Sequence, residues 1–101
     1  AKLSGTNLSE ADLGGADLTA ANLTGAYLNS ADLTAANLTG ANLSGAYLNR
    51  ANLSRANLSG AVLDQAHLSE ANLTGAAVTS EQLAQAGSLA GTTLPDGTKH
   101  E

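Results

Sequence analysis

Residues 21–30 read ANLTGAYLNS and residues 41–50 read ANLSGAYLNR, so the two stretches agree at eight of ten positions after a shift of 20. Within each stretch Leu recurs every five residues, and Ala stands two positions before each Leu. The same spacing of Leu runs from Leu3 to Leu73, and Val78 takes the next, sixteenth place. The chain thus begins with sixteen units of the form A-[N/D]-L-[S/T]-G.

A period of five residues fits neither a continuous helix nor a continuous strand. On an α-helix successive Leu residues would lie about 140° apart and form no apolar face. Along an unbroken strand an odd period sends alternate Leu residues to opposite faces. The pattern therefore predicts a corner in every unit, with Ala and Leu pointing inward and the Asn or Asp between them pointing outward.

The corner is expected to be a β-turn centred on the two residues that follow each Leu. Gly at the second of these positions, as in Gly25, suits the positive φ of a type II turn. Units without Gly there are expected to use another turn type, because a side chain disfavours that φ. Such units end in Ala20, Arg50, Arg55 or Glu70.

The shift of 20 residues indicates how many corners make one coil. Tyr27, Tyr47 and His67 follow one another at this interval, which equals four units. The sequence therefore predicts an all-β solenoid, a quadrilateral parallel β-helix of about four coils. The preference of parallel crossovers for one hand predicts a right-handed coil.

These tandem units resemble the pentapeptide-repeat family, whose signature is A-[D/N]-L-x-x. The resemblance covers residues 1–80 and implies the right-handed quadrilateral β-helix of that family. The family is abundant in cyanobacteria, and most members have no assigned biochemical role. A subset resembles B-form DNA in shape and charge and acts on DNA gyrase, which makes a DNA-mimicking gyrase modulator an alternative function.

The repeat ends at residue 80, so the sequence predicts a β-helix over 1–80 and a cap over 81–101. Ser80 is expected to be the N-cap of a short helix that ends near Gly87. Leu83 and Leu89 would then cover the open end of the solenoid, as terminal caps must. A turn at Pro95-Asp96-Gly97 and a frayed tail from Thr98 onward complete the predicted cap.

Composition excludes several classes of protein. There is no Cys, which excludes disulfides and thiolate metal sites, and the net charge of −5 argues against a nucleic-acid or anionic membrane partner. No apolar run reaches the roughly 18 residues of a membrane span, and no signal-peptide core follows Ala1, so a cytoplasmic location is expected over export. A core of Leu and Ala leaves no room for a cofactor, and none is expected.

The column of Tyr27, Tyr47 and His67 is the candidate interaction site, because aromatic side chains that are stacked in a row can also stack on a partner. Asp12 and Asp32 lie one coil apart, but no third ligand or cleft accompanies them, so we interpret them as a solvated ladder. No catalytic or metal-binding set of residues is present.

Another column places hydroxyl groups one coil apart, as ice-binding solenoids do. It consists of Thr19, Thr39, Ser59 and Thr79. Because Ser and Thr fill the same position on the other sides, we interpret the column as a consequence of the repeat. Ice binding is therefore only a remote alternative.

The first coil shows no cap. Its edge would expose the inward side chains of Leu3, Leu8, Leu13 and Leu18, which we call the N-terminal rim. Exposed strand edges favour association, so a homodimer through this rim is expected. The sequence as a whole indicates a non-enzymatic scaffold or protein-interaction module whose protein partner it does not identify.

Overall fold

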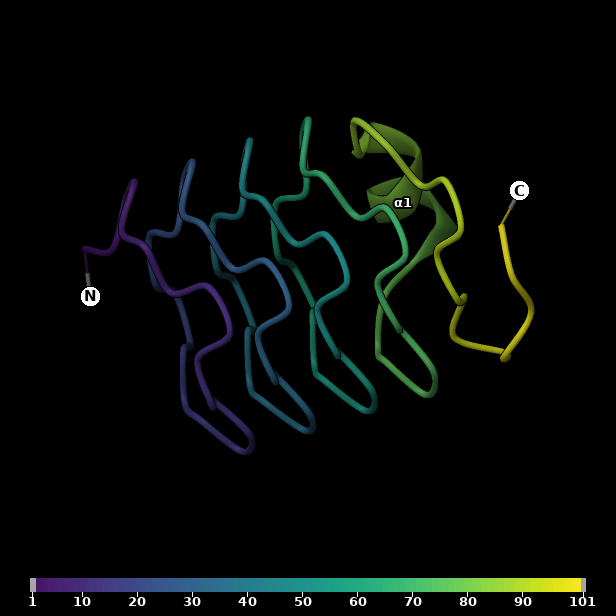
Figure 1. The fold of residues 1–101 in the computed structure, drawn as a ribbon, viewed down its shortest axis with the longest axis horizontal. Helices are drawn as coiled ribbons and strands as arrows, with labels where there is room; N and C mark the ends of the chain where they lie inside the picture. The colour runs from purple at the N-terminus through teal and green to yellow at the C-terminus, as the bar shows by residue number, and fades with distance from the viewer. Residues whose placement is uncertain (1, 101) are drawn as a thin grey trace.

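The computed structural model describes residues 2–100, which form a stack of similar coils running from the N-terminal to the C-terminal end (Figure 1). From Lys2 to Asn57, the outward residue of each unit forms a parallel bridge with the residue twenty positions further on, as Asn22 does with Asn42 and Tyr27 with Tyr47. We number the coils 1 to 4, beginning at residues 2, 21, 41 and 61. The predicted coil of 20 residues is therefore confirmed. The inward position of Ala1 and the end of the tail at Glu101 lie outside the described residues.

Each corner from Leu8 to Leu73 is closed by one hydrogen bond, from the N–H of the next unit's Ala to the carbonyl of the preceding Leu, and Thr6 takes the place of Ala at the first corner. The bond from Ala26 N to Leu23 O, of 3.0 Å, is representative. The residue before that Ala has a positive φ, +65° at Gly25, as a type II turn requires. The turn predicted for the Gly units is confirmed.

The expectation of another turn type for the units without Gly is wrong. Ala20, Arg50, Arg55 and Glu70 have φ between 59° and 61°. The reason lies in the contact between coils, because the N–H of this residue must donate to the next coil, as Ala20 N does to Thr39 O at 2.8 Å. A left-handed conformation costs a residue with a side chain about 1–2 kcal/mol, and the ladder of hydrogen bonds holds it there.

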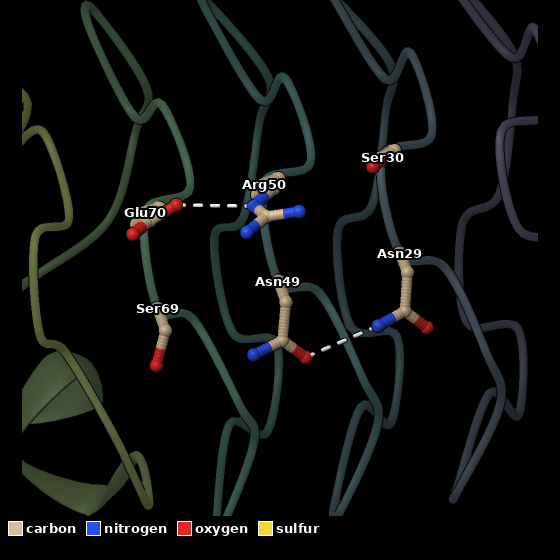
Figure 2. Close-up of a pocket in the computed structure, with 6 residues that line it drawn as sticks. All are labelled: Asn29, Ser30, Asn49, Arg50, Ser69 and Glu70. Atoms are coloured by element: carbon tan, nitrogen blue, oxygen red, sulfur yellow. Dashed lines mark hydrogen bonds and ion pairs between the residues drawn. The ribbon is translucent and has the colours of Figure 1, made fainter.

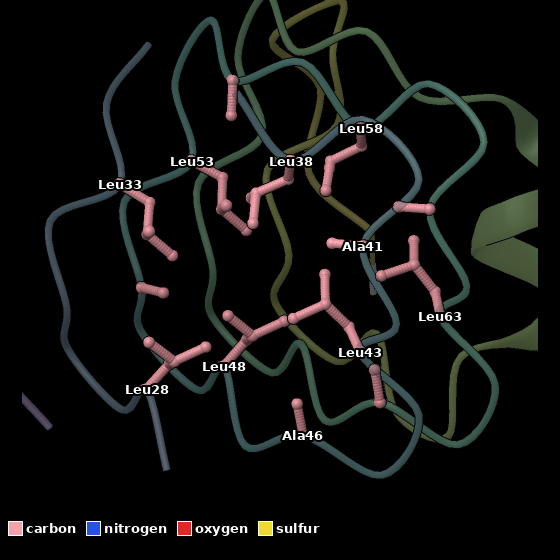
Figure 3. Close-up of a cluster of buried hydrophobic side chains, with 14 of the residues drawn as sticks. Leu28, Leu33, Leu38, Ala41, Leu43, Ala46, Leu48, Leu53, Leu58 and Leu63 are labelled. Atoms are coloured by element: carbon pink, nitrogen blue, oxygen red, sulfur yellow. The ribbon is translucent and has the colours of Figure 1, made fainter. Parts of the chain in front are cut away.

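The core is made almost wholly of Leu and Ala. In coils 2 to 4 every inward Leu from Leu23 to Leu73 is at most 2% exposed, and the inward Ala residues are at most 7% exposed. Figure 3 shows the Leu side chains between Leu28 and Leu63 pointing into one shared interior. The four Leu residues of the N-terminal rim pack against this core and are only half-buried.

Helix α1 (Ser80–Gln85) replaces the corner that would begin a fifth coil, and it lies beside the C-terminal end of the stack (Figure 1). Its N-cap is Thr79 rather than the expected Ser80, because the Thr79 hydroxyl accepts from the N–H of Gln82 and the Gln82 side chain bonds back to Thr79. Leu83 of α1 belongs to the core cluster and is 9% exposed, and Leu89 packs against the same cluster and is partly buried.

Residues 86–95 continue the ladder as half of a fifth coil. Ser88 bridges in parallel to His67, and Thr93 bridges to Asn72. The tail is not frayed up to His100, because Lys99 pairs antiparallel with Thr93 and the N–H of His100 donates to Thr92. Over residues 2–100, no helix has the length and apolar character needed to cross a bilayer.

Candidate functional site

Tyr27, Tyr47 and His67 form the aromatic column that the sequence suggested. The ring centroids of Tyr27 and Tyr47 lie 4.8 Å apart with 4° between their planes, and those of Tyr47 and His67 lie 4.7 Å apart with 3° between theirs. The spacing equals that of neighbouring strands, so the ladder itself places the rings in contact. Tyr27, at the N-terminal end of the stack, is 44% exposed.

A second column, which we call the amide column, runs beside the first and was missed in the sequence. The Asn29 side-chain Nδ2 atom donates to the side-chain Oδ1 atom of Asn49 at 3.3 Å, and the hydroxyl groups of Ser69 and Ser88 are hydrogen-bonded at 2.7 Å. Asn29, Asn49 and Ser69 each stand two positions after an aromatic residue, with a buried Leu between them, and Ser88 follows Ser69 by 19 residues. The spacing of 20 residues among the first three was the signal, and it was hidden because Ser and Thr usually occupy this position.

The corner next to the amide column carries an ion pair. The Arg50 Nε atom donates to Glu70 Oε1, one coil further on, at 3.0 Å (Figure 2). Both side chains are more than 60% exposed. Between the amide column and this corner lies a hollow of about 190 Å³, lined by Asn29, Ser30, Asn49, Arg50, Ser69 and Glu70. We call the aromatic column, the amide column and this corner together the aromatic face.

Asp12 and Asp32 are adjacent on the ladder, but each carboxylate accepts hydrogen bonds from the turn that follows it in its own repeat. Asp12 Oδ1 accepts from the N–H of Gly14 at 3.3 Å, and Asp32 Oδ1 accepts from the N–H of Thr34 at 3.0 Å and from its hydroxyl at 2.6 Å. The hydroxyl bond, and then the backbone bond, lower the pKa of Asp32. The two carboxylates are thus turn-stabilising acceptors. Within residues 2–100 no group of three or more metal-ligating side chains gathers.

Side chains of the hydroxyl column also form hydrogen bonds within their own turns or cap a helix. Thr19 Oγ1 donates to Asp17 Oδ1 and Thr39 Oγ1 donates to Asn37 Oδ1, both at 2.6 Å, and Thr79 caps helix α1. Hydroxyl groups engaged in this way stabilise turns. The remaining candidate, the N-terminal rim, is brought together at the edge of coil 1, away from the capped end (Figure 1).

The comparisons with known proteins agree with this architecture. The family model described as "Pentapeptide repeats" matches residues 1–40 and 36–75, with eight copies. The search of curated proteins gives no match.

Solved structures show the same fold. One is HetL, a pentapeptide repeat protein involved in heterocyst differentiation regulation from the cyanobacterium Nostoc sp. strain PCC 7120, at 38% identity over 98% of this chain, with a TM-score of 0.62. Another is QnrB1, a plasmid-mediated fluoroquinolone resistance protein, at 16% identity over 89% of this chain, with a TM-score of 0.57. The chain spans 43% of the length of HetL and 58% of that of QnrB1. The repeat, the coil geometry and these matches lead to one conclusion: the chain belongs to the pentapeptide-repeat family.

Proposed function

We propose that the chain is a non-enzymatic solenoid scaffold, a right-handed quadrilateral β-helix, that binds another protein through its aromatic face. The observation that carries the proposal is the alignment of the aromatic column, the amide column and the Arg50–Glu70 pair on one side of coils 2 to 4. Protein interfaces are enriched in Tyr and Arg, which combine apolar area with polar contacts.

The face is prepared for binding before a partner arrives. Tyr47 is held between two rings, and the Asn29 and Asn49 amides are held by each other, so these groups are already ordered. Ordering a flexible side chain at an interface costs about 0.5–1.5 kcal/mol, and a preformed face avoids that loss. Oxygen and nitrogen atoms around the hollow then offer directional contacts to a partner's backbone (Figure 2).

A scaffold role agrees with the interior of the molecule. Leu and Ala fill coils 2 to 4, and the hollow on the aromatic face contains one ion pair that is largely exposed to solvent. Exposed ion pairs provide little of the electrostatic stabilisation that catalysis needs. HetL is involved in heterocyst differentiation regulation, and a regulatory role of that kind fits a binding module.

A DNA-mimicking modulator of gyrase is the alternative function. Four coils at about 4.8 Å span about 19 Å, and B-DNA of that length carries roughly eleven negative charges. The chain has a net charge of −5, and Arg50 neutralises Glu70 on the aromatic face. The charge density therefore favours the scaffold role. Likeness to QnrB1 at 16% identity adds the fold alone.

The test is affinity capture from a lysate of the source organism, read by mass spectrometry. A Tyr27→Ala/Tyr47→Ala variant should lose a partner that wild type retains. Val62→Ala is the matched control, because Val62 is an outward residue on another side and is 39% exposed. Equal recovery by wild type and both variants would reject the aromatic face, provided their melting temperatures show that all are folded.

Two further assays address the alternatives. Inhibition of gyrase supercoiling by the purified protein would favour the DNA mimic, and thermal hysteresis would favour ice binding. The cytoplasmic location and the homodimer through the N-terminal rim stay predictions.

A further inference from the structure

The first ring of the aromatic column keeps one face free. Tyr47 has a ring on each side, since it stacks on Tyr27 and on His67. Within residues 2–100, Tyr27 has a ring on one side only. Tyr27 is accordingly 44% exposed, whereas Tyr47 is half-buried. The column can therefore take one more planar group, at the free face of Tyr27.

The neighbour of Tyr27 in coil 1 leaves this face uncovered. Asn7 forms a parallel bridge with Tyr27, so the two residues are one strand spacing apart on the ladder. The Asn7 side chain is bound to its own turn, because its Oδ1 atom accepts from the N–H of Ser9 at 3.0 Å. A side chain from another molecule can thus reach the ring over Asn7. This place lies between coils 1 and 2 and does not involve the edge of the stack.

The surroundings of the free face are acidic. Between Lys2 and Arg50 the chain holds four carboxylate side chains and neither Lys nor Arg, and its net charge is −5. One of these carboxylates belongs to Glu10, which is exposed at the corner that ends the Asn7 side of coil 1. The four residues are Glu10, Asp12, Asp17 and Asp32. A cation that approaches Tyr27 is therefore attracted by this part of the solenoid.

We propose that the free face of Tyr27 is a binding site for an arginine side chain of the partner protein. A guanidinium group is planar and permanently charged, and it stacks on aromatic rings. Over Asn7 it continues the aromatic column, and its charge lies on the side of the coil that ends in Glu10. The inference rests on the proposed function, because it names the side chain that the aromatic face receives.

Other side chains match this place less well. An aromatic ring stacks on Tyr27 but gains nothing from the carboxylates around it. A Lys ammonium is compact and strongly hydrated, so it has no planar face to lay on the ring. An Asp or Glu side chain is repelled by Glu10. The guanidinium group alone combines a flat surface with a positive charge.

The probe is N-acetyl-L-arginine amide, which is added to the full chain and followed by NMR. The chain holds two Tyr and neither Phe nor Trp, so every tyrosine ring signal comes from the aromatic column. The ring protons of Tyr27 should shift more than those of Tyr47, and the shifts should saturate. The citrulline amide has the same shape without the charge and should bind about two- to fivefold more weakly, as an exposed cation–π contact requires. The lysine amide should also bind more weakly.

Asn7→Phe tests where the arginine binds. The new ring should occupy the free face of Tyr27 and abolish the shift that the arginine probe causes. Asn22→Phe is the matched control, because Asn22 is the outward residue of a unit on another side and its Oδ1 atom also accepts from the N–H two residues on. Amide exchange at Leu28 and Leu48, whose N–H groups bond between coils, shows whether each variant is folded.

Glu10→Gln tests the contribution of charge. It should weaken binding of the arginine probe about twofold, because the lost charge is exposed. It should leave binding of the citrulline amide unchanged. Glu81→Gln is the control, since it removes an exposed charge from helix α1.

Three results would overturn the proposal: no saturable shift at Tyr27, equal binding of the arginine and citrulline amides, or equal shifts in Asn7→Phe and Asn22→Phe. The lysate capture separates this inference from the proposed function. A partner that Tyr27→Ala/Tyr47→Ala loses and Asn7→Phe retains would uphold the aromatic face and overturn the arginine site. Charge-dependent binding of the probe, with equal recovery by wild type and the double Tyr variant, would support the arginine site and reject the proposed function.

Discussion

At the last position of every repeat up to residue 75 the backbone adopts the left-handed conformation, whether that residue is Gly or carries a side chain. Gly25 has φ of 65° and Arg55 has φ of 59°. The Arg55 N–H also donates to Thr74 O in the next coil at 2.8 Å. The ladder of hydrogen bonds, and not the type of side chain, therefore determines the backbone conformation of the turn. The residue type then determines only how much strain the turn retains.

Gly14 and Gly15 allow a direct test of this strain. Gly15 has φ of 70°, and a Cβ added to it would meet only open space, whereas Gly14 lacks a positive φ and a Cβ there would make ordinary contacts. Gly15→Ala should lower the free energy of unfolding by about 1–2 kcal/mol. Gly14→Ala should be neutral or stabilise by about 0.4–1 kcal/mol. Urea denaturation measures both, and equal effects would contradict a turn controlled by φ.

Carboxylates within the turns should make the fold sensitive to acid. Hydrogen bonds from Thr19 and Thr34 lower the pKa of Asp17 and Asp32 below their ordinary value. A depressed folded-state pKa contributes stability above the unfolded pKa of about 3.9, and this stability is lost as pH falls through the folded pKa. The fold should therefore weaken below about pH 4.

The double variant Asp17→Asn/Asp32→Asn should retain the turns and lose part of this acid sensitivity. Asn is a suitable replacement because Asn37 accepts the same pair of bonds from Thr39. Melting temperatures measured between pH 7 and pH 3 provide the test. An unchanged pH profile would show that other carboxylates control the acid response.

At the scale of one element, each coil is a layer of four inward Leu residues that is stabilised only by the layers on either side. Leu43 is fully buried in coil 3, whereas Leu3, in the same column, lies at the open edge. Leu43→Ala should destabilise by about 2–5 kcal/mol. Leu3→Ala should cost less, since its environment is already partly solvated. Equal losses would mean that coil 1 is covered on its N-terminal side.

The corners contribute less than the layers. Arg50→Ala should change the free energy of unfolding by at most about 1 kcal/mol, because the pair with Glu70 is exposed. The change should become smaller in high salt, which screens exposed charges. Measurements of stability at two salt concentrations check this, and a large loss that salt does not alter would contradict it.

At the scale of the whole molecule, the cap gives the solenoid two different ends. The Gln82 side chain donates to two carbonyls of the core, while Gln85, on the same helix, is exposed. Gln82→Ala should cost about 1–3 kcal/mol, because it leaves those carbonyls without that donor. Gln85→Ala should be close to neutral. Amide exchange should locate the loss in coil 4, and uniform weakening of all coils would argue against a local cap.

Much of this architecture follows from the sequence by itself. The period of five fixes which residues point inward, and the shift of 20 fixes which residues are neighbours, so the aromatic column and the Arg50–Glu70 pair could be predicted. Both rules are local, because each unit repeats the backbone path of the last. The same regularity concealed the amide column, where Asn29 and Asn49 replace the usual Ser or Thr and bond across coils instead of within a turn.

Only the tertiary structure decided the features that depend on contact between coils. Ala20, Arg50, Arg55 and Glu70 adopt a conformation that their own propensities disfavour, because the N–H of each must reach the next coil. The tail up to His100 is ordered because the last coil offers it a ladder to join. Local sequence determines the shape of one unit. These two features depend instead on hydrogen bonds between units: bonds between neighbouring coils, about twenty residues apart, and bonds between the tail and the last coil. The energy of such bonds cannot be deduced from any single unit.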